Sequence, residues 1–125
     1  MLEDSVAYSG FSVDDLAKAK QFYGSTLGLK IEDNPLGLTL RIKGRNGIFI
    51  YPKDNHQAAT YTILNFPVAD IEKAVDWLSE KGVQFEHYAG MTDARGIARD
   101  PDPTHPLIAW FKDPAGNYLS IIQRR

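Results

Sequence analysis

The chain has 125 residues, with 14 basic and 16 acidic side chains and a formal net charge of −2 at pH 7. This length suits one ordinary domain, and the balanced charge excludes electrostatic attraction to nucleic acid or to an anionic membrane. The absence of cysteine excludes disulfides, zinc–thiolate clusters and a cysteine nucleophile. No apolar run approaches the ~20 residues of a membrane span and no secretory signal is visible, so we expect a soluble, cytoplasmic protein.

The first half of the chain is expected to form a strand, a helix and three more strands. The helix opens at Asp15, a residue type that caps helix N-termini, and stops at Gly28, the type favoured just past a helix end. Asn46-Gly47 predicts a hairpin turn between the last two strands. The strands are expected at residues 6–12, 29–33, 38–43 and 47–51.

The second half repeats the first at an offset of 55 residues. FSVDDLAKAKQFY, residues 11–23, aligns with FPVADIEKAVDWL, residues 66–78, so that Asp15 meets Asp70. Two copies of so long a unit indicate a duplicated half-domain and not an array of repeats. The copy is expected to form a helix from Asp70 to Gly82 and strands at residues 61–67, 83–88, 107–112 and 117–123.

The expected fold class is therefore α+β, built from two tandem βαβββ modules. We expect a single domain over residues 1–125, with module 1 at about 1–52, a linker at about 53–59 and module 2 at about 60–125.

A long segment at residues 89–106 has three prolines, no periodicity and several charges. A loop of this length in a compact domain is usually functional or disordered. It contains charged residues that suit either a lid contributing a charge to a ligand or a solvated loop. These residues are Asp93, Arg95, Arg99, Asp100 and Asp102.

Strand alternation divides the side chains between a helix-covered face and an open, concave face. Apolar residues such as Val13, Leu119 and Ile121 are expected beneath the helices, and Trp77 is expected to pack from its helix onto the sheet. The mixed set, expected on the concave face, comprises Tyr8, Phe49, Asn65, Trp110, Tyr118 and Ser120. Aromatic side chains with a few polar groups are typical of a small-molecule site, although they also suit the filling of space between two sheets.

Together with the duplicated unit, the segments VDDLAKAKQFYGSTLGL and FKDPAGNYLSII resemble the vicinal oxygen chelate superfamily. Its members include glyoxalases, bleomycin-resistance proteins, fosfomycin-resistance enzymes and extradiol dioxygenases. The resemblance covers essentially the whole chain. It implies two modules that form a curved mixed sheet around a cavity, commonly within a homodimer.

The resemblance also implies where a metal would bind. The four ligand positions of the superfamily's metal enzymes fall on Tyr8, Ile63, Ser120 and either Phe49 or Ile50. A catalytic divalent metal needs at least two or three His or carboxylate ligands. Since these positions supply one phenol and one hydroxyl, we expect no metal site and no cofactor.

The three histidines lie in unrelated expected elements and have no ligand spacing. His56 is in the linker, His87 is at the end of a strand and His105 is in the long loop. His87 is a candidate acid or base if it faces the pocket, and otherwise an ordinary hydrogen-bonded side chain.

The leading hypothesis is a metal-independent protein that binds an unidentified small molecule, similar in design to the bleomycin-resistance type. One alternative is a lyase or isomerase of glyoxalase type, or a dioxygenase, with an unconventional metal site. Another is an interaction module with a vestigial pocket. The expected partners are the small molecule and a second copy of the chain, and neither nucleic acid nor membrane.

Overall fold

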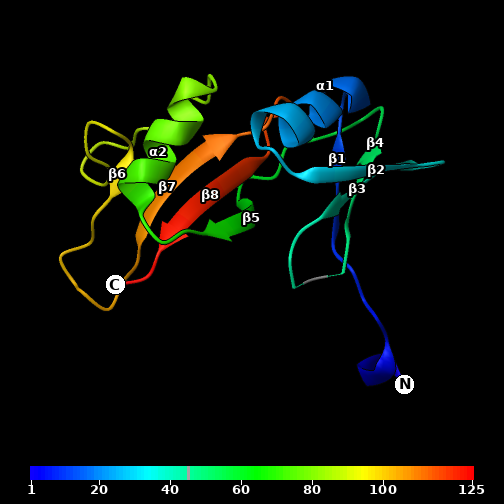
Figure 1. Cartoon of the computed structure of the whole chain (residues 1–125), viewed down its shortest axis with the longest axis horizontal. Helices are drawn as coiled ribbons and strands as arrows, with labels where there is room; N and C mark the ends of the chain where they lie inside the picture. Colours follow the sequence, from blue (N-terminus) through cyan, green and yellow to red (C-terminus); the bar gives the residue numbers. More distant parts are fainter. Residues whose placement is uncertain (45) are drawn as a thin grey trace. The chain divides into compact units, whose positions relative to one another are not determined.

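The structure is a computed structural model that describes residues 1–44 and 46–125. The chain divides into two compact units, Met1–Ala58 and Ala59–Arg125, whose boundary falls inside the expected linker. In the part that the structure describes, each unit contains one four-stranded mixed sheet and a helical segment after its first strand, and the first unit also has the short helix η1 (Figure 1). The α+β class and the duplicated module are therefore confirmed, with the expected sheet realised as two sheets of four strands.

The first unit forms its sheet in the strand order β1-β4-β3-β2. Strands β1 and β4 pair in parallel, whereas β3 pairs antiparallel with both β2 and β4. The helical segment begins as an α-helix, α1, and continues as a π-helical stretch, η2. The elements are η1 (Leu2–Asp4), β1 (Gly10–Val13), α1 (Leu16–Lys20), η2 (Gln21–Thr26), β2 (Lys30–Asn34), β3 (Gly37–Arg41) and β4 (Ile48–Pro52).

The second unit has the matching order β5-β8-β7-β6. Strands β5 and β8 pair in parallel, and β7 pairs antiparallel with both β6 and β8. The elements are β5 (Thr62–Pro67), α2 (Ile71–Glu80), β6 (Ile97–Ala98), β7 (Leu107–Lys112) and β8 (Tyr118–Gln123). No helix among the described residues is long and apolar enough to cross a membrane.

Both helices begin at the expected aspartates. The carboxylates of Asp15 and Asp70 accept hydrogen bonds from the backbone N–H groups of Lys18 and Lys73, each at 3.1 Å. These bonds satisfy donors that a helix N-terminus otherwise leaves without a partner. At the C-terminal ends, Gly28 and Gly82 adopt φ values of 72° and 92°, in the left-handed region that favours glycine.

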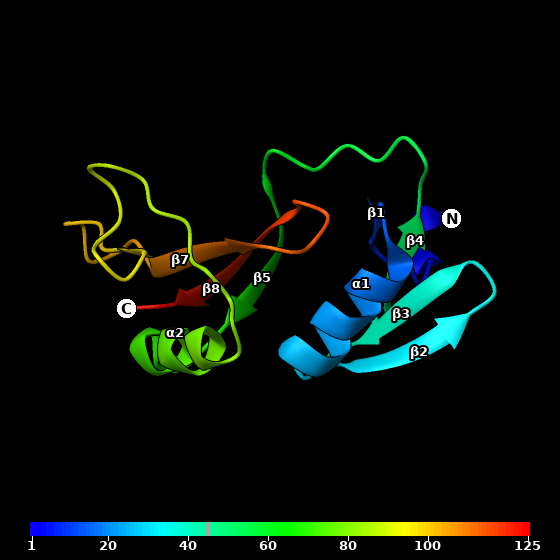
Figure 2. The same ribbon diagram turned by 90° about the horizontal axis from the view of Figure 1, so that it is seen from above.

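One face of each sheet carries the core and is covered by the helix of its own unit (Figure 2). Alternate strand residues that face the helix are buried, whereas their neighbours point to the open face. Val13, Leu119 and Ile121 are each at most 3% exposed, as expected. The other buried strand residues on the helix side include Leu38, Leu40, Ile48, Ile50, Leu64, Leu107, Ala109 and Phe111.

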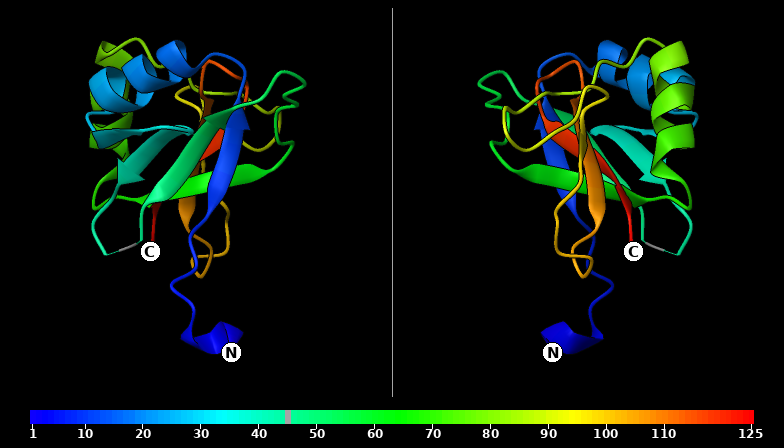
Figure 3. Two further views of the ribbon diagram at one scale, coloured as in Figure 1. Left: turned by 90° about the vertical axis from the view of Figure 1, so that its right-hand side faces the viewer. Right: turned by 90° about the vertical axis from the view of Figure 1, so that its left-hand side faces the viewer.

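The first strand is shorter than expected. It begins at Gly10 and not at residue 6, because its partner β4 pairs with it only from Phe49 onward. The preceding residues form an extended segment that leads away from the sheet to η1 (Figure 3). Asn46 Nδ2 donates a hydrogen bond to the Ala7 carbonyl at 2.9 Å and so ties this segment to the β3–β4 connection.

The hairpin between β3 and β4 forms as expected, but its connection does not follow the predicted turn. The left-handed glycine in this loop is Gly44, with φ 77°, and Gly47 is not among the positive-φ glycines. Part of the predicted turn, at residue 45, lies outside the described residues.

The prediction of a strand at residues 83–88 was wrong. Val83 and Phe85 are buried and give this segment its strand-like alternation, but it contacts the sheet through a single bridge, Phe85 to Phe111. The edge beside β7 is occupied by β6, from within the segment expected to be a loop. The reason is that the chain turns back near Tyr88, whose carbonyl accepts hydrogen bonds from Met91 and Thr92.

The placement of Trp77 against the sheet was also wrong. The buried residues of α2 are Ile71, Val75 and Leu78, at the three-to-four spacing of one helix face. Trp77 lies about 100° around the helix from Leu78, is 48% exposed, and has the Lys81 ammonium 4.8 Å from its ring centroid.

Two adjacent substitutions on α2 test this assignment. Leu78→Ala should lower the free energy of unfolding by about 2–5 kcal/mol, because it empties a buried site. Trp77→Ala should lower the free energy of unfolding by about 1 kcal/mol or less, because the ring is half exposed and contacts Lys81 on the helix surface. Urea denaturation followed by circular dichroism measures both, and an equal or larger loss for Trp77→Ala would contradict the burial pattern.

Candidate functional site

The open face of the first sheet carries a hollow of about 480 Å³, here named the Arg41 hollow. Tyr8 and Phe49, two of the expected site residues, both line it. Phe49 points to this face because its neighbours Ile48 and Ile50 point to the helix. The remaining lining residues are Val6, Asn34, Leu36, Thr39, Arg41, Asn46 and Gly47.

Hydrogen bonds fix the polar side chains around the Arg41 hollow. Asn34 Nδ2 donates to Thr39 Oγ1 at 3.1 Å, and Asn34 Oδ1 accepts from the Leu36 amide at 2.9 Å. Arg41 Nη2 donates to Glu32 Oε2 at 2.9 Å. The hydrogen bond from Arg41 lowers the pKa of Glu32, so this pair is charged on both sides at neutral pH.

The second sheet carries an aromatic hollow of about 370 Å³ on its open face, here named the Trp110 hollow. Trp110 on β7 and Tyr118 on β8, both expected site residues, line it. The Tyr88 ring meets Trp110 edge to face, with centroids 5.8 Å apart. The other lining residues are Thr60, Tyr61, Thr62 and Met91.

The charge environment of the Trp110 hollow is set at one side by Lys112. Its ammonium lies 4.9 Å from the Tyr118 ring centroid and 3.3 Å from Glu86 Oε1. Burial, followed by the hydrogen bond with Tyr118, raises the pKa of Tyr88. Tyr88 is therefore neutral at physiological pH, and the rings of the hollow offer aromatic surface.

Asn65 and Ser120 form a hydrogen-bonded pair beside the Trp110 hollow. They are opposite each other on the paired strands β5 and β8, and Ser120 is also opposite Trp110 on β7. Ser120 Oγ donates to Asn65 Oδ1 at 2.6 Å, and Ser120 is fully buried whereas Asn65 is exposed. Four expected site residues thus share one face of the second sheet. That they and the two residues of the first unit bind one ligand stays a prediction.

Several lining residues were not singled out from the sequence. Thr39 and Arg41 follow from strand alternation, because they alternate with the buried Leu38 and Leu40. Tyr88 and Met91 had no such signal, since they lie in an irregular segment that only long-range packing brings to the hollow.

The positions at which the superfamily's metal enzymes hold their ion carry poor ligands. Ser120 is hydrogen-bonded to Asn65, Tyr8 is 68% exposed, and Ile63 lies where the β5–β8 register shifts. Ile50 is buried on the helix side. This donor set does not fit a catalytic divalent ion. Among the described residues, no three His, Cys, Asp or Glu side chains are grouped as a metal site would require.

The three histidines lie in separate environments. His56 Nδ1 is 2.7 Å from Ser12 Oγ, and His105 Nδ1 is 3.0 Å from Asp100 Oδ2. His87 lines a different hollow, next to α2, together with Val75 and Arg95. It is not among the residues that line the Trp110 hollow, so the geometry gives it no acid or base role there.

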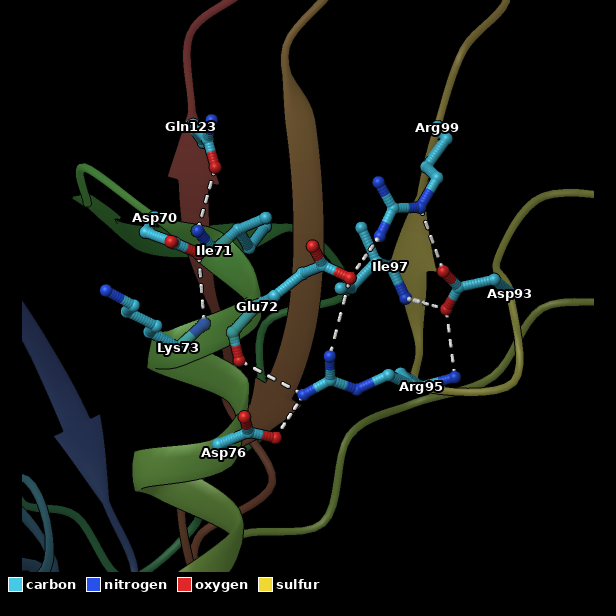
Figure 4. Close-up of polar contacts among 10 residues, drawn as sticks. All are labelled: Asp70, Ile71, Glu72, Lys73, Asp76, Asp93, Arg95, Ile97, Arg99 and Gln123. Carbon is cyan, nitrogen blue, oxygen red and sulfur yellow. Dashed lines mark hydrogen bonds and ion pairs between the residues drawn. The ribbon is translucent and has the colours of Figure 1, made fainter.

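The middle of the long loop is fastened to α2 by a charge network (Figure 4). Arg95 contacts Asp76 and donates from Nη2 to the Glu72 carbonyl at 3.0 Å, while Arg99 Nη2 donates to Glu72 Oε1 at 3.2 Å. Asp93 accepts from the amides of Arg95 and Ile97, each at 2.9 Å, and from Arg99 Nε at 3.0 Å.

The acidic residues further along the loop are also held by neighbouring groups of the protein. Asp100 contacts His105, and the Arg125 guanidinium donates to the carbonyls of Asp102 and His105, each at 2.9 Å. The loop charges that were candidates for a lid therefore bind residues of the loop itself or of α2.

The sequence matches the family model of the Glyoxalase/Bleomycin resistance protein/Dioxygenase superfamily over residues 5–121. The chain belongs to this superfamily, as its resemblance implied. The curated protein YraH of Bacillus subtilis (strain 168), named as uncharacterized, is 30% identical, with 80% of this chain and 91% of that protein covered.

Solved structures of the same fold include two with assigned roles. TnmS3, an antibiotic binding protein from Streptomyces sp. CB03234, is 23% identical to this chain, with a TM-score of 0.73. The match covers 100% of this chain and 99% of the TnmS3 chain. The fosfomycin resistance protein FosX from Listeria monocytogenes has a TM-score of 0.72 and 15% identity, with coverages of 96% and 93%. At these identities the likeness shows a shared fold.

Removing the Asp93 carboxylate should loosen the loop. Burial raises the pKa of Asp93, but the hydrogen bonds from Ile97, Arg99 and Arg95 outweigh it, and the pKa is lowered. The restraint is thus present above about pH 4 and is lost as pH falls through the lowered pKa. Asp93→Ala should speed tryptic cleavage at Arg95 and Arg99 several-fold at neutral pH, because three hydrogen bonds are lost.

The matched control is Asp54→Ala, which removes an exposed aspartate from the first unit and should leave cleavage of the loop unchanged. Time courses of digestion followed by mass spectrometry give the rates. Equal cleavage rates in wild type and Asp93→Ala would show that the carboxylate does not hold the loop.

Proposed function

We propose that this protein binds a small organic molecule without a metal ion and without changing it chemically. The observation that carries the proposal is the Trp110 hollow, where aromatic side chains surround an open space beside the satisfied pair of Ser120 and Asn65. Concave, largely apolar surfaces with a few placed polar groups are typical of small-molecule sites. The proposed ligand-binding residues are Tyr8, Phe49, Asn65, Trp110, Tyr118 and Ser120.

The superfamily relationship supports this reading. TnmS3 is an antibiotic binding protein of the same fold, so the scaffold supports binding of such a compound. A metal-dependent lyase, isomerase or dioxygenase would need ligands at positions where this chain has Tyr8, Ile63 and Ser120. The Ser120 hydroxyl already donates to Asn65, and the Ile63 side chain has no atom that can bind a metal. These positions therefore do not favour metal-dependent chemistry.

We also propose a homodimer. Large apolar side chains stay exposed around both hollows, which is unusual unless another surface or a ligand covers them. Tyr8 is 68%, Leu36 74%, Tyr61 70% and Met91 58% exposed. A second copy of the chain, as the superfamily resemblance implies, would cover such residues and the free edges of the sheets.

The binding function is tested by a thermal-shift screen of small aromatic and dicarbonyl compounds. A ligand should raise the melting temperature, because binding stabilises the folded state by RT ln(1 + [L]/Kd), where [L] is the free ligand concentration. Calorimetry on a hit should show that Trp110→Ala weakens binding by about tenfold or more, since a large aromatic often carries much of the contact area. Excess EDTA should leave the affinity unchanged.

Trp77→Ala is the matched control, because Trp77 lies on α2 and lines neither hollow. It should keep the wild-type affinity. A screen without any hit would favour an interaction module, whereas a hit whose binding disappears with EDTA would favour the metal-dependent alternatives.

The association state is tested by light scattering coupled to size-exclusion chromatography. The mass at micromolar protein concentration should be twice the 14.0 kDa of one chain. A single species at the mass of one chain would refute the dimer.

A further inference from the structure

The Arg41 hollow has a charged residue in its lining, whereas the lining of the Trp110 hollow has none among the described residues. Of the residues that line it within the described part of the chain, Arg41 is the one with a formal charge. Its side chain is 48% exposed, so it is accessible to a solute. The other lining groups are hydroxyls, amides and apolar side chains. The carboxylate next to the hollow is that of Glu32, which lies opposite Thr39 on β2 and is bound to Arg41.

Gly47 leaves space for the Arg41 guanidinium, because it has no side chain. A Cβ added at Gly47 would be 2.9 Å from Arg41 Nη1 and 2.4 Å from Thr39 Cγ2, both closer than such contacts allow. Gly47 does not have a positive φ, so a left-handed backbone conformation is not the reason for glycine at this position. Space for Arg41 and Thr39 is therefore the structural reason for glycine at this position.

The guanidinium keeps donors available for a ligand. Glu32 accepts from Nη2 and holds the group in place, while Nη1 and Nε make no hydrogen bond among the described residues. A guanidinium has five N–H donors, so one carboxylate partner leaves most of them unused. Thr39 Oγ1 accepts from Asn34, which leaves its own hydrogen free to donate in the same hollow.

An aromatic surface lies next to these donors. Phe49 is opposite Thr39 on the paired strand and stacks on Tyr51 with ring centroids 5.4 Å apart. Tyr8 lines the same hollow. Arg41 and Thr39 on β3 can donate to an anion, and the Phe49 ring lies on the next strand. This combination suits a flat apolar molecule that carries a carboxylate.

We propose that Arg41, with Thr39, is the residue that selects ligands bearing a carboxylate on a planar aromatic body. The proposal rests on the small-molecule binding function and names the ligand class that the Arg41 hollow of the first unit would take. Gly47 acts as the positioning residue, because it leaves room for the guanidinium. Phe49 supplies the surface for the ring.

Nuclear magnetic resonance titration of ¹⁵N-labelled protein tests the proposal with two flat probes of similar shape, benzoate and benzamide. Benzoate should shift the amide signals of Thr39 and Gly47 and bind about tenfold more tightly than benzamide, the range expected for hydrogen bonds to a charged group. Arg41→Gln should abolish this preference. Arg41→Lys should keep part of it, because the charge stays but the planar fork is lost.

Two further variants test whether any nearby cation is enough and whether the position of the Arg41 guanidinium matters. Lys30→Gln removes a cation from the residue directly opposite Arg41 on β2, one that does not line the hollow, and should leave the preference for benzoate intact. Gly47→Ala keeps Arg41 but should displace it and reduce the preference several-fold. Each variant should retain the wild-type amide spectrum away from this loop.

The outcomes distinguish this inference from the broader function. Equal binding of benzoate and benzamide, or a preference that survives Arg41→Gln, overturns the role of Arg41 and leaves small-molecule binding standing. If neither probe shifts Thr39 or Gly47, the carboxylate assignment is wrong, while the thermal-shift screen still decides the binding function. Loss of the preference in Lys30→Gln as well as Arg41→Gln would reveal a general charge effect and would also overturn the inference.

Discussion

The parallel pairing of the first and last strand of each module is the constraint on which the rest of the structure depends. Strands β1 and β4, and likewise β5 and β8, run side by side in the same direction, so the chain must cross over between them. The helix that follows the first strand of each module covers one sheet face. Apolar side chains gather beneath it, and the opposite face is left without a covering helix of its own module.

The uncovered faces are where the modules differ chemically. The first presents Arg41, Thr39 and Phe49, and the second presents Trp110 and Tyr118. Because the side chains alternate, these residues can vary without disturbing the apolar face that packs on the helix. Thus a duplicated scaffold can carry two unlike surfaces. Function within a superfamily depends on the residues of its sites and not on the fold alone.

Two polar groups of the second unit, Ser120 and Asp93, have hydrogen-bond partners within the protein, which limits what chemistry they can perform. Ser120 donates to Asn65 in the buried part of the second sheet, and Asp93 is held by two amides and Arg99. Exposed ion pairs such as Arg99 with Glu72 each contribute little stability. The amide hydrogen bonds from Arg95 and Ile97 to Asp93 restrain the backbone of this part of the loop.

The sequence by itself determined the duplication, the helix starts at Asp15 and Asp70, and the division of strand residues between two faces. These features depend on local periodicity and capping, which neighbouring residues specify. Only the tertiary structure decided that Ile97–Ala98, and not residues 83–88, forms the edge strand, and that Trp77 is half exposed. Strand pairing and the packing of one helix face depend on contacts far apart in sequence, as does the space at Gly47 that admits Arg41.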